Sequence, residues 1–80
     1  MLKIQLFIMD NKEDSLLKLG RRLTELRQKQ DLSIDELATR AGIGAAEIGG
    51  IEAGKVDPPL TSILALCRAL GLSPGQLLNI

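Results

Sequence analysis

Residues 33–55 decide the fold of this chain and read SIDELATRAGIGAAEIGGIEAGK. Ser33 is followed three residues later by Glu36, the spacing of a capping box, in which each side chain bonds to the backbone amide of the other residue. A helix is therefore expected to open at Ser33. It is expected to end at Gly42, because glycine adopts the left-handed conformation that closes a helix without a steric penalty. A second short helix is expected over residues 45–53, so the stretch predicts two helices joined by a tight turn.

Helices are also predicted on both sides of this pair. Residues 15–30 carry four leucines at spacings of three and four, which places them on one face of a helix. These are Leu16, Leu19, Leu23 and Leu26. Residues 60–70 carry an apolar face formed by Leu60, Ile63, Leu64, Cys67 and Leu70. A last helix starts at Ser73, which forms a second capping box with Gln76. The predicted fold is therefore all-α, with five short helices.

Composition limits the chain to one small domain and to few kinds of chemistry. The chain has 80 residues, with 10 basic and 10 acidic side chains, so it carries no net charge. It lacks the excess of Lys and Arg that is typical of nucleic-acid binding, so what matters is where the charges lie. A single cysteine, Cys67, and the lack of histidine exclude an intramolecular disulfide and a Cys/His metal site. We therefore expect no metal or other cofactor, no catalytic residues and a reducing, cytoplasmic environment.

Residues 1–14 are interpreted as an N-terminal arm, and residues 15–80 as the helical domain. Apolar residues alternate along the arm with the period of a strand. They are Leu2, Ile4, Leu6 and Ile8. A lone strand needs a partner for its backbone, so one interpretation pairs the arm with its twin across a homodimer. A helix extension, a packed coil and a disordered end are the alternatives. The apolar part is too short to span a membrane.

Two helices joined by a tight, glycine-containing turn are typical of a helix-turn-helix. LSIDELATRAGI at residues 32–43 resembles the first half of the lambda-repressor/Cro-like, or xenobiotic-response-element type, helix-turn-helix family. IGGIEAGK at residues 48–55 resembles the end of its recognition helix. PPL at residues 58–60 and LCRALGLS at residues 66–73 resemble its last two helices. The resemblance covers residues 19–78 and implies a compact five-helix, lambda-repressor-like DNA-binding domain.

The resemblance also implies how the domain meets double-stranded DNA. The helix over residues 45–53 would lie in the major groove. Its base-reading positions are Gly44, Ala45, Ala46, Glu47, Gly49 and Gly50. Contacts to DNA phosphates are assigned to Arg40 and Lys55. Family dimers read half-sites about one helical turn apart, which implies a homodimer. In the family an arginine and an acidic residue at the positions of Arg27 and Glu52 often pair, and we assign this ion pair to the fold.

The predicted base-reading positions depart from the family pattern. Directed hydrogen bonds to base edges need residues such as Gln, Arg, Ser, Asn or Thr, whereas these positions hold Gly, Ala and one Glu. Alanine can touch a thymine methyl, and Glu47 can accept from a cytosine amine, but no Lys or Arg lies between Ala41 and Gly54. Ile34 stands where the family usually has a Gln that contacts phosphate. Base readout is therefore expected to be weak or unusual.

Two functions fit this pattern. The first is a dimeric, DNA-binding transcriptional regulator with weak or unusual base readout. The alternative is a protein-interaction or dimerisation module that keeps the fold but has lost sequence-specific DNA binding. Ala45 and Gly49 lie four residues apart, as do Ala46 and Gly50, so together they form a smooth strip that another helix or backbone can approach. In this alternative a protein partner binds through that helix, whereas in the first the same face lies against DNA.

Overall fold

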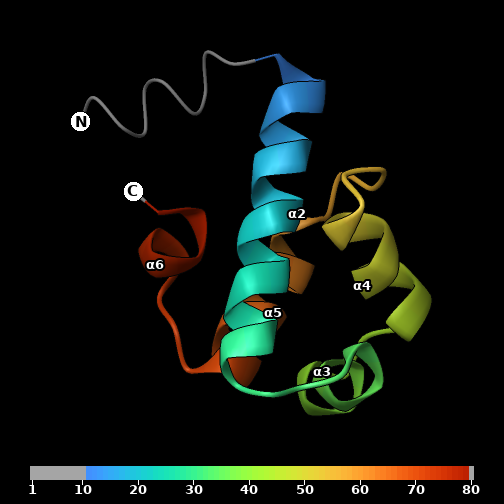
Figure 1. Ribbon diagram of the computed structural model, residues 1–80, viewed down its shortest axis with the longest axis vertical. Helices are drawn as coiled ribbons and strands as arrows, with labels where there is room; N and C mark the ends of the chain where they lie inside the picture. The colour runs from blue at the N-terminus through green and yellow to red at the C-terminus, as the bar shows by residue number, and fades with distance from the viewer. Residues whose placement is uncertain (1–10, 80) are drawn as a thin grey trace.

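The computed structural model describes residues 11–79, and this part of the chain contains five helices (Figure 1). They are α2 (Lys12–Lys29), α3 (Ile34–Ala41), α4 (Ala45–Glu52), α5 (Leu60–Leu70) and α6 (Pro74–Leu78). The long α2 runs through the middle of the view, with α4 on one side of it and α6 on the other, while α5 passes behind it. This arrangement confirms the predicted all-α, five-helix fold.

Side-chain caps open α3 and α6 where the sequence predicts them. At α3 the backbone N–H of Glu36 donates to the Ser33 hydroxyl (3.0 Å), and the Ser33 N–H donates to the Glu36 carboxylate (2.8 Å). Ser73 and Gln76 exchange the same two hydrogen bonds at α6. The hydrogen bonds with the Ser33 backbone and hydroxyl lower the pKa of Glu36, because they stabilise its charged form.

The start of α2 differs from the prediction. The helix begins at Lys12, three residues earlier than expected, because Asn11 caps it. The side-chain oxygen of Asn11 accepts a hydrogen bond of 2.8 Å from the Asp14 N–H. Residues 12–14, which were expected in the arm, are therefore helical. Residues 1–10 lie outside the described residues, so the pairing of the arm with a second copy stays a prediction.

The core lies where the five helices converge. Six large apolar side chains are almost fully buried: Leu23, Leu37, Ile48, Ile51, Leu66 and Leu77. Burial of this kind contributes about 1.5–3 kcal/mol for each such side chain. Cys67 joins them at 3% exposure, and its burial raises the pKa of the thiol. It therefore packs as a small apolar side chain, because the reactive thiolate is disfavoured there.

The buried face of α5 agrees only in part with the predicted one. Ile63, Cys67 and Leu70 are buried as expected, but Leu60 is 70% exposed and Leu64 is 44% exposed. Leu66, which the prediction left out, is completely buried. Both α3 and α6 pack on α5, and these contacts select the stripe that includes Leu66. The prediction that Leu60 and Leu64 face the core was therefore wrong.

Gly20 sets how closely α2 and α4 approach one another. A Cβ atom at this position would lie 2.5 Å from the backbone oxygens of both Ile51 and Glu52. Non-bonded atoms do not pack so closely, so only glycine lets the middle of α2 cross the last turn of α4 here. This contact helps to fix the position of α4.

Candidate nucleic-acid interface

α3 and α4 form the helix-turn-helix, and three residues, Gly42, Ile43 and Gly44, join them. Gly42 has a left-handed backbone with a φ of 72°. Its N–H and the N–H of Ile43 both donate to the Ala38 carbonyl, at 2.8 and 3.2 Å. The half-buried Ile43 packs against the core, which holds the turn from inside. The Gly44 carbonyl then accepts from the Ile48 N–H at 3.2 Å, and this bond begins α4.

An ion pair fixes the end of α4 to the end of α2. The Nε of Arg27 donates to Oε2 of Glu52 at 2.7 Å, and its Nη2 donates to Oε1 at 3.0 Å. The remaining nitrogen, Nη1, donates to the Leu32 carbonyl at 2.8 Å. Only 13% of the Arg27 side chain and 9% of the Glu52 side chain are exposed. The hydrogen bond to Glu52 raises the pKa of Arg27, although burial acts in the opposite direction. The pair orients α4, and each of the three guanidinium nitrogens of Arg27 donates a hydrogen bond within the protein.

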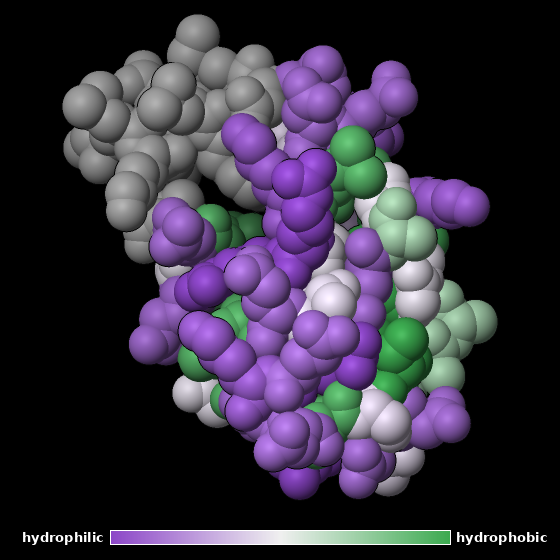
Figure 2. Space-filling view, viewed as in Figure 1, coloured by the Kyte–Doolittle hydropathy of each residue, from purple (hydrophilic) through white to green (hydrophobic). Residues whose placement is uncertain are grey.

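The outward face of α4 carries almost no side chain. Ala46 is exposed, and a Cβ atom added at Gly44 or Gly49 would meet no atom within 4 Å. Figure 2 shows the surface over α4, at the right edge, mostly in white and green, with hydrophilic side chains beyond both of its ends. Three of the six predicted base-reading positions therefore point to open space, but none of the three offers a side-chain hydrogen-bond donor or acceptor.

The other three predicted base-reading residues make contacts within the protein. Ala45 is half-buried and packs against the core. A Cβ atom at Gly50 would run into Cγ2 of Val56. The carboxylate of Glu47 accepts a hydrogen bond of 2.6 Å from the hydroxyl of Ser62, which is buried in α5. Of the six predicted positions, three thus face open space and three make contacts within the protein.

Two exposed cations flank α4 in the sequence. Arg40 stands in the last turn of α3, and Lys55 stands in the loop that follows α4. The backbone N–H of Lys55 donates to the Gly50 carbonyl at 2.9 Å, which holds that loop against the helix. Arg40 thus precedes α4 in the chain and Lys55 follows it, so the helix-turn-helix carries an exposed cation on each side of α4 in sequence.

Two other basic residues serve the fold or the local surface. The Arg22 guanidinium donates to the Gln76 carbonyl at 3.0 and 3.3 Å and so joins α2 to α6. Lys12 forms an exposed ion pair of 3.3 Å with Asp57. Ile34, at the start of α3, packs partly against the core. It has no polar group for a phosphate.

Sequence reasoning missed three residues that position α4. Two of them have a signal in the sequence that could have identified them. Gly20 interrupts a leucine-rich helix, and Ser62 is a polar residue beside apolar ones at the start of a helix. Val56 has no such signal in the sequence, because its contact with Gly50 depends on the path of the loop.

Within residues 11–79, no group of three or more His, Cys, Asp or Glu side chains is placed to hold a metal ion. No helix in the same range is long and apolar enough to cross a membrane.

Most of this chain is similar in sequence to known proteins. Residues 18–79 match the family described as helix-turn-helix domain. The HTH-type transcriptional regulator PuuR of Escherichia coli (strain K12) is 38% identical over 57 residues, which are 71% of this chain and 31% of PuuR. An uncharacterized HTH-type transcriptional regulator of Bacillus subtilis (strain 168), YobD, is 34% identical over 59 residues, which are 74% of this chain and 53% of YobD. The chain thus spans about half of one of these relatives and under a third of the other.

A solved structure shows the same arrangement of helices. The restriction-modification controller protein C.AhdI from Aeromonas hydrophila superposes with a TM-score of 0.78 and is 39% identical in sequence. The match covers 80% of this chain and 97% of C.AhdI. Nearly the whole of that protein therefore corresponds to the helical domain described above.

Proposed function

This chain belongs to the lambda-repressor/Cro-like family of helix-turn-helix domains, and we propose that it is the DNA-binding part of a transcriptional regulator. One observation carries the proposal: α4 has an open outward face, and the exposed cations Arg40 and Lys55 precede and follow it in the helix-turn-helix. The major groove of B-DNA is about 12 Å wide and admits an α-helix. With α4 in this groove, we assign Arg40 and Lys55 to the phosphates that border it.

Most of the binding free energy in this proposal comes from phosphates. The open positions Gly44, Ala46 and Gly49 offer no side-chain hydrogen bond, so the recognition helix lacks the bidentate contacts that discriminate bases by about 1–3 kcal/mol each. The Ala46 methyl group is suited to touch a thymine methyl. The two glycines let the backbone of α4 come closer to the base edges than a longer side chain would allow. Base readout is therefore weak, and phosphate contacts set the affinity.

Glu47 has a supporting role in this proposal. Its carboxylate is held by the Ser62 hydroxyl, so accepting from a cytosine amine would require that bond to break. Its negative charge near the phosphates is also unfavourable for binding. We therefore assign Glu47 to the positioning of α4, and we assign binding to Arg40 and Lys55.

The proposed assembly is a homodimer on two half-sites. One α4 alone offers too little base contact to select a site, and two copies about one helical turn apart double both the phosphate contacts and the few base contacts. The resemblance to the family supports this arrangement.

The test is the salt dependence of binding to fluorescently labelled, random-sequence duplex DNA, followed by anisotropy. Binding in the micromolar range at about 50 mM salt is expected to fall steeply by about 200 mM, because each phosphate contact releases counterions. Arg40→Ala and Lys55→Ala are each expected to weaken binding to all sequences and to reduce the slope of log K against log salt by about 1.

Arg68→Ala is the matched control, since Arg68 is exposed in the last turn of α5 rather than beside α4. This variant is expected to bind as the parent does. An absence of binding at the lowest salt would refute the proposed function. Unchanged slopes in both Arg40→Ala and Lys55→Ala would refute the phosphate assignments alone.

A further inference from the structure

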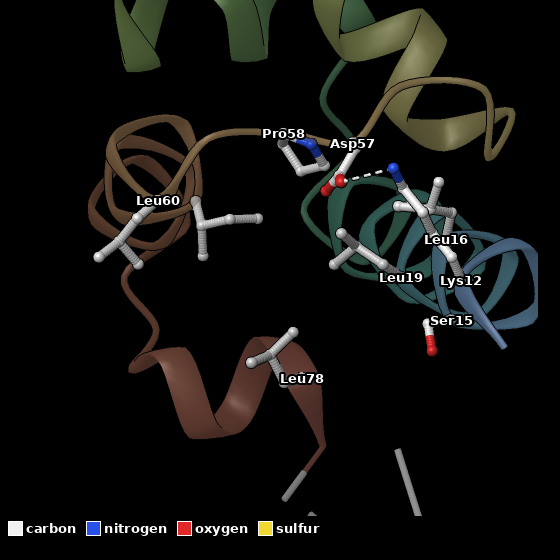
Figure 3. A pocket seen from close by; sticks show the side chains of 9 residues that line it. Lys12, Ser15, Leu16, Leu19, Asp57, Pro58, Leu60 and Leu78 are labelled. Atoms are coloured by element: carbon white, nitrogen blue, oxygen red, sulfur yellow. Dashed lines mark ion pairs between the residues drawn. The ribbon is translucent and has the colours of Figure 1, made fainter. Parts of the chain in front are cut away.

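An apolar pocket of about 370 Å³ lies away from α4, between the first half of α2, the start of α5, and α6 (Figure 3). Six apolar residues line it: Leu16, Leu19, Pro58, Leu60, Ile63 and Leu78. They come from three helices and from the loop before α5. The pocket is a second surface of the domain, separate from the face that meets DNA in the proposed function.

The rim of this pocket exposes a large apolar side chain to water. Leu60 is 70% exposed at the first position of α5. In Figure 3, Leu78 points from α6 into the space opposite α5. The Lys12–Asp57 ion pair closes one edge and is the charged part of the rim. An apolar hollow with a large exposed leucine at its mouth is typical of a surface that binds another apolar segment.

The chain itself has such a segment in its sequence, shortly before the helix that borders the pocket. Residues 2–9 read LKIQLFIM, in which only Lys3 and Gln5 are polar. The segment ends two residues before Asn11, which caps α2, and the first residues of that helix, Lys12 and Ser15, also line the pocket. Eight extended residues span up to about 28 Å, so the whole segment can lie across the pocket without a linker.

We propose that residues 2–9 of the same chain bind this pocket through their apolar side chains. The alternating residues Leu2, Ile4, Leu6 and Ile8 share one face of an extended segment, and that face covers Leu60 and fills the space between α2, α5 and α6. A directly connected segment has an effective concentration of about millimolar or above. It therefore occupies the pocket ahead of the same segment of a second copy at micromolar protein concentration. This proposal is independent of DNA binding.

The experiment detects the contact in the full-length chain by methyl NMR. The chain is labelled at Ile, Leu and Val methyl groups, and nuclear Overhauser effects are sought between Ile4 or Ile8 and Leu60 or Leu78. A mixture of labelled and unlabelled chains, measured with isotope filtering, separates contacts within one chain from contacts between two. Cross-peaks within one chain are expected. Their absence, or their appearance only between chains, overturns the proposal, and the second result supports a dimer formed through the arm.

Two leucines of α5 give a matched pair of variants. Leu60→Asp changes a pocket residue that is mostly exposed, so the domain is expected to stay folded and the cross-peaks from residues 2–9 are expected to disappear. Leu64→Asp changes an exposed leucine of the same helix that does not line the pocket, and the cross-peaks are expected to persist. Equal loss in both variants, or persistence in Leu60→Asp, overturns the assignment of the pocket. Helical circular dichroism of each variant checks the fold.

Discussion

Glu47 and Ser62 share a hydrogen bond of 2.6 Å that ties the first turn of α4 to the first turn of α5. The Ser62 hydroxyl, buried at 6% exposure, donates to Oε2 of the half-buried glutamate. α4 otherwise packs mainly on α2 and α3. The bond therefore supports the half of α4 that is farthest from the Arg27–Glu52 ion pair.

This bond predicts an energetic coupling between the two residues. Glu47→Ala leaves the buried Ser62 hydroxyl without this partner, which costs about 1–3 kcal/mol of stability. Ser62→Ala costs less, about 1 kcal/mol, because water can reach the freed carboxylate. Urea denaturation of both single variants and the double variant measures the coupling. A double variant whose loss equals the sum of the single losses would show that the bond contributes nothing.

Three glycines are expected to respond differently to alanine. Gly49→Ala should stabilise the domain by about 1 kcal/mol, because alanine is the better helix former and its methyl group meets open space. Gly50→Ala should lose that gain, because the methyl group collides with Val56. Gly20→Ala should destabilise the domain by about 1–3 kcal/mol, because it pushes α2 away from the carbonyls of α4.

Thermal denaturation of the three glycine variants gives the order of their stabilities. The expected order is Gly49→Ala above the parent, Gly50→Ala at or below it, and Gly20→Ala lowest. If Gly20→Ala were as stable as Gly49→Ala, the close approach of α2 and α4 would be refuted.

Removing one partner of the Arg27–Glu52 pair should be costly. Arg27→Ala is expected to destabilise the domain by about 3–5 kcal/mol, because it leaves the Glu52 charge with little access to water. Arg27→Lys keeps the charge but cannot make the three hydrogen bonds of the guanidinium, so it should recover only part of the loss. Guanidinium chloride denaturation compares the two. Full recovery by lysine would mean that charge alone matters.

The capping box of α3 predicts a dependence of stability on pH. The pKa of Glu36 in the folded chain lies below its ordinary value of 4.5. Its contribution to stability is therefore present above pH 4.5 and is lost as the pH falls through the lowered, folded-state pKa. Glu36→Gln keeps an acceptor for the cap but does not titrate. Between about pH 5 and pH 3 the unfolding free energy of this variant should fall less than that of the parent. Parallel pH profiles would contradict this.

The open positions of α4 predict that base readout can be added. Gly49→Gln places an amide where the added Cβ meets no atom. If α4 lies in the major groove, this variant should discriminate among DNA sequences by about 1–3 kcal/mol, through a bidentate contact to adenine. Selection from a random DNA library, compared between the parent and Gly49→Gln, measures the change. The control is Thr61→Gln, because Thr61 is exposed on α5. Gly71→Gln is not suitable as a control, because Gly71 has a left-handed backbone.

The sequence by itself determined the family, the helices and most of their ends. Ser33 with Glu36, and Ser73 with Gln76, open helices through bonds that span three residues, and Gly42 closes one through its own backbone conformation. Such signals are local, so they can be followed along the chain. The exception was the start of α2, where Asn11 provides a cap that the prediction did not consider.

Only the tertiary structure decided which way the side chains of α4 and α5 face and what they meet. Gly20 meets Ile51, and Glu47 meets Ser62, across loops and turns whose paths no short pattern specifies. Helical periodicity places residues on a face, but the neighbouring helices decide which face is buried, and so Leu60 is exposed where the pattern expected it inside. The open face of α4 and the apolar pocket both arise from packing between segments that are distant in the sequence.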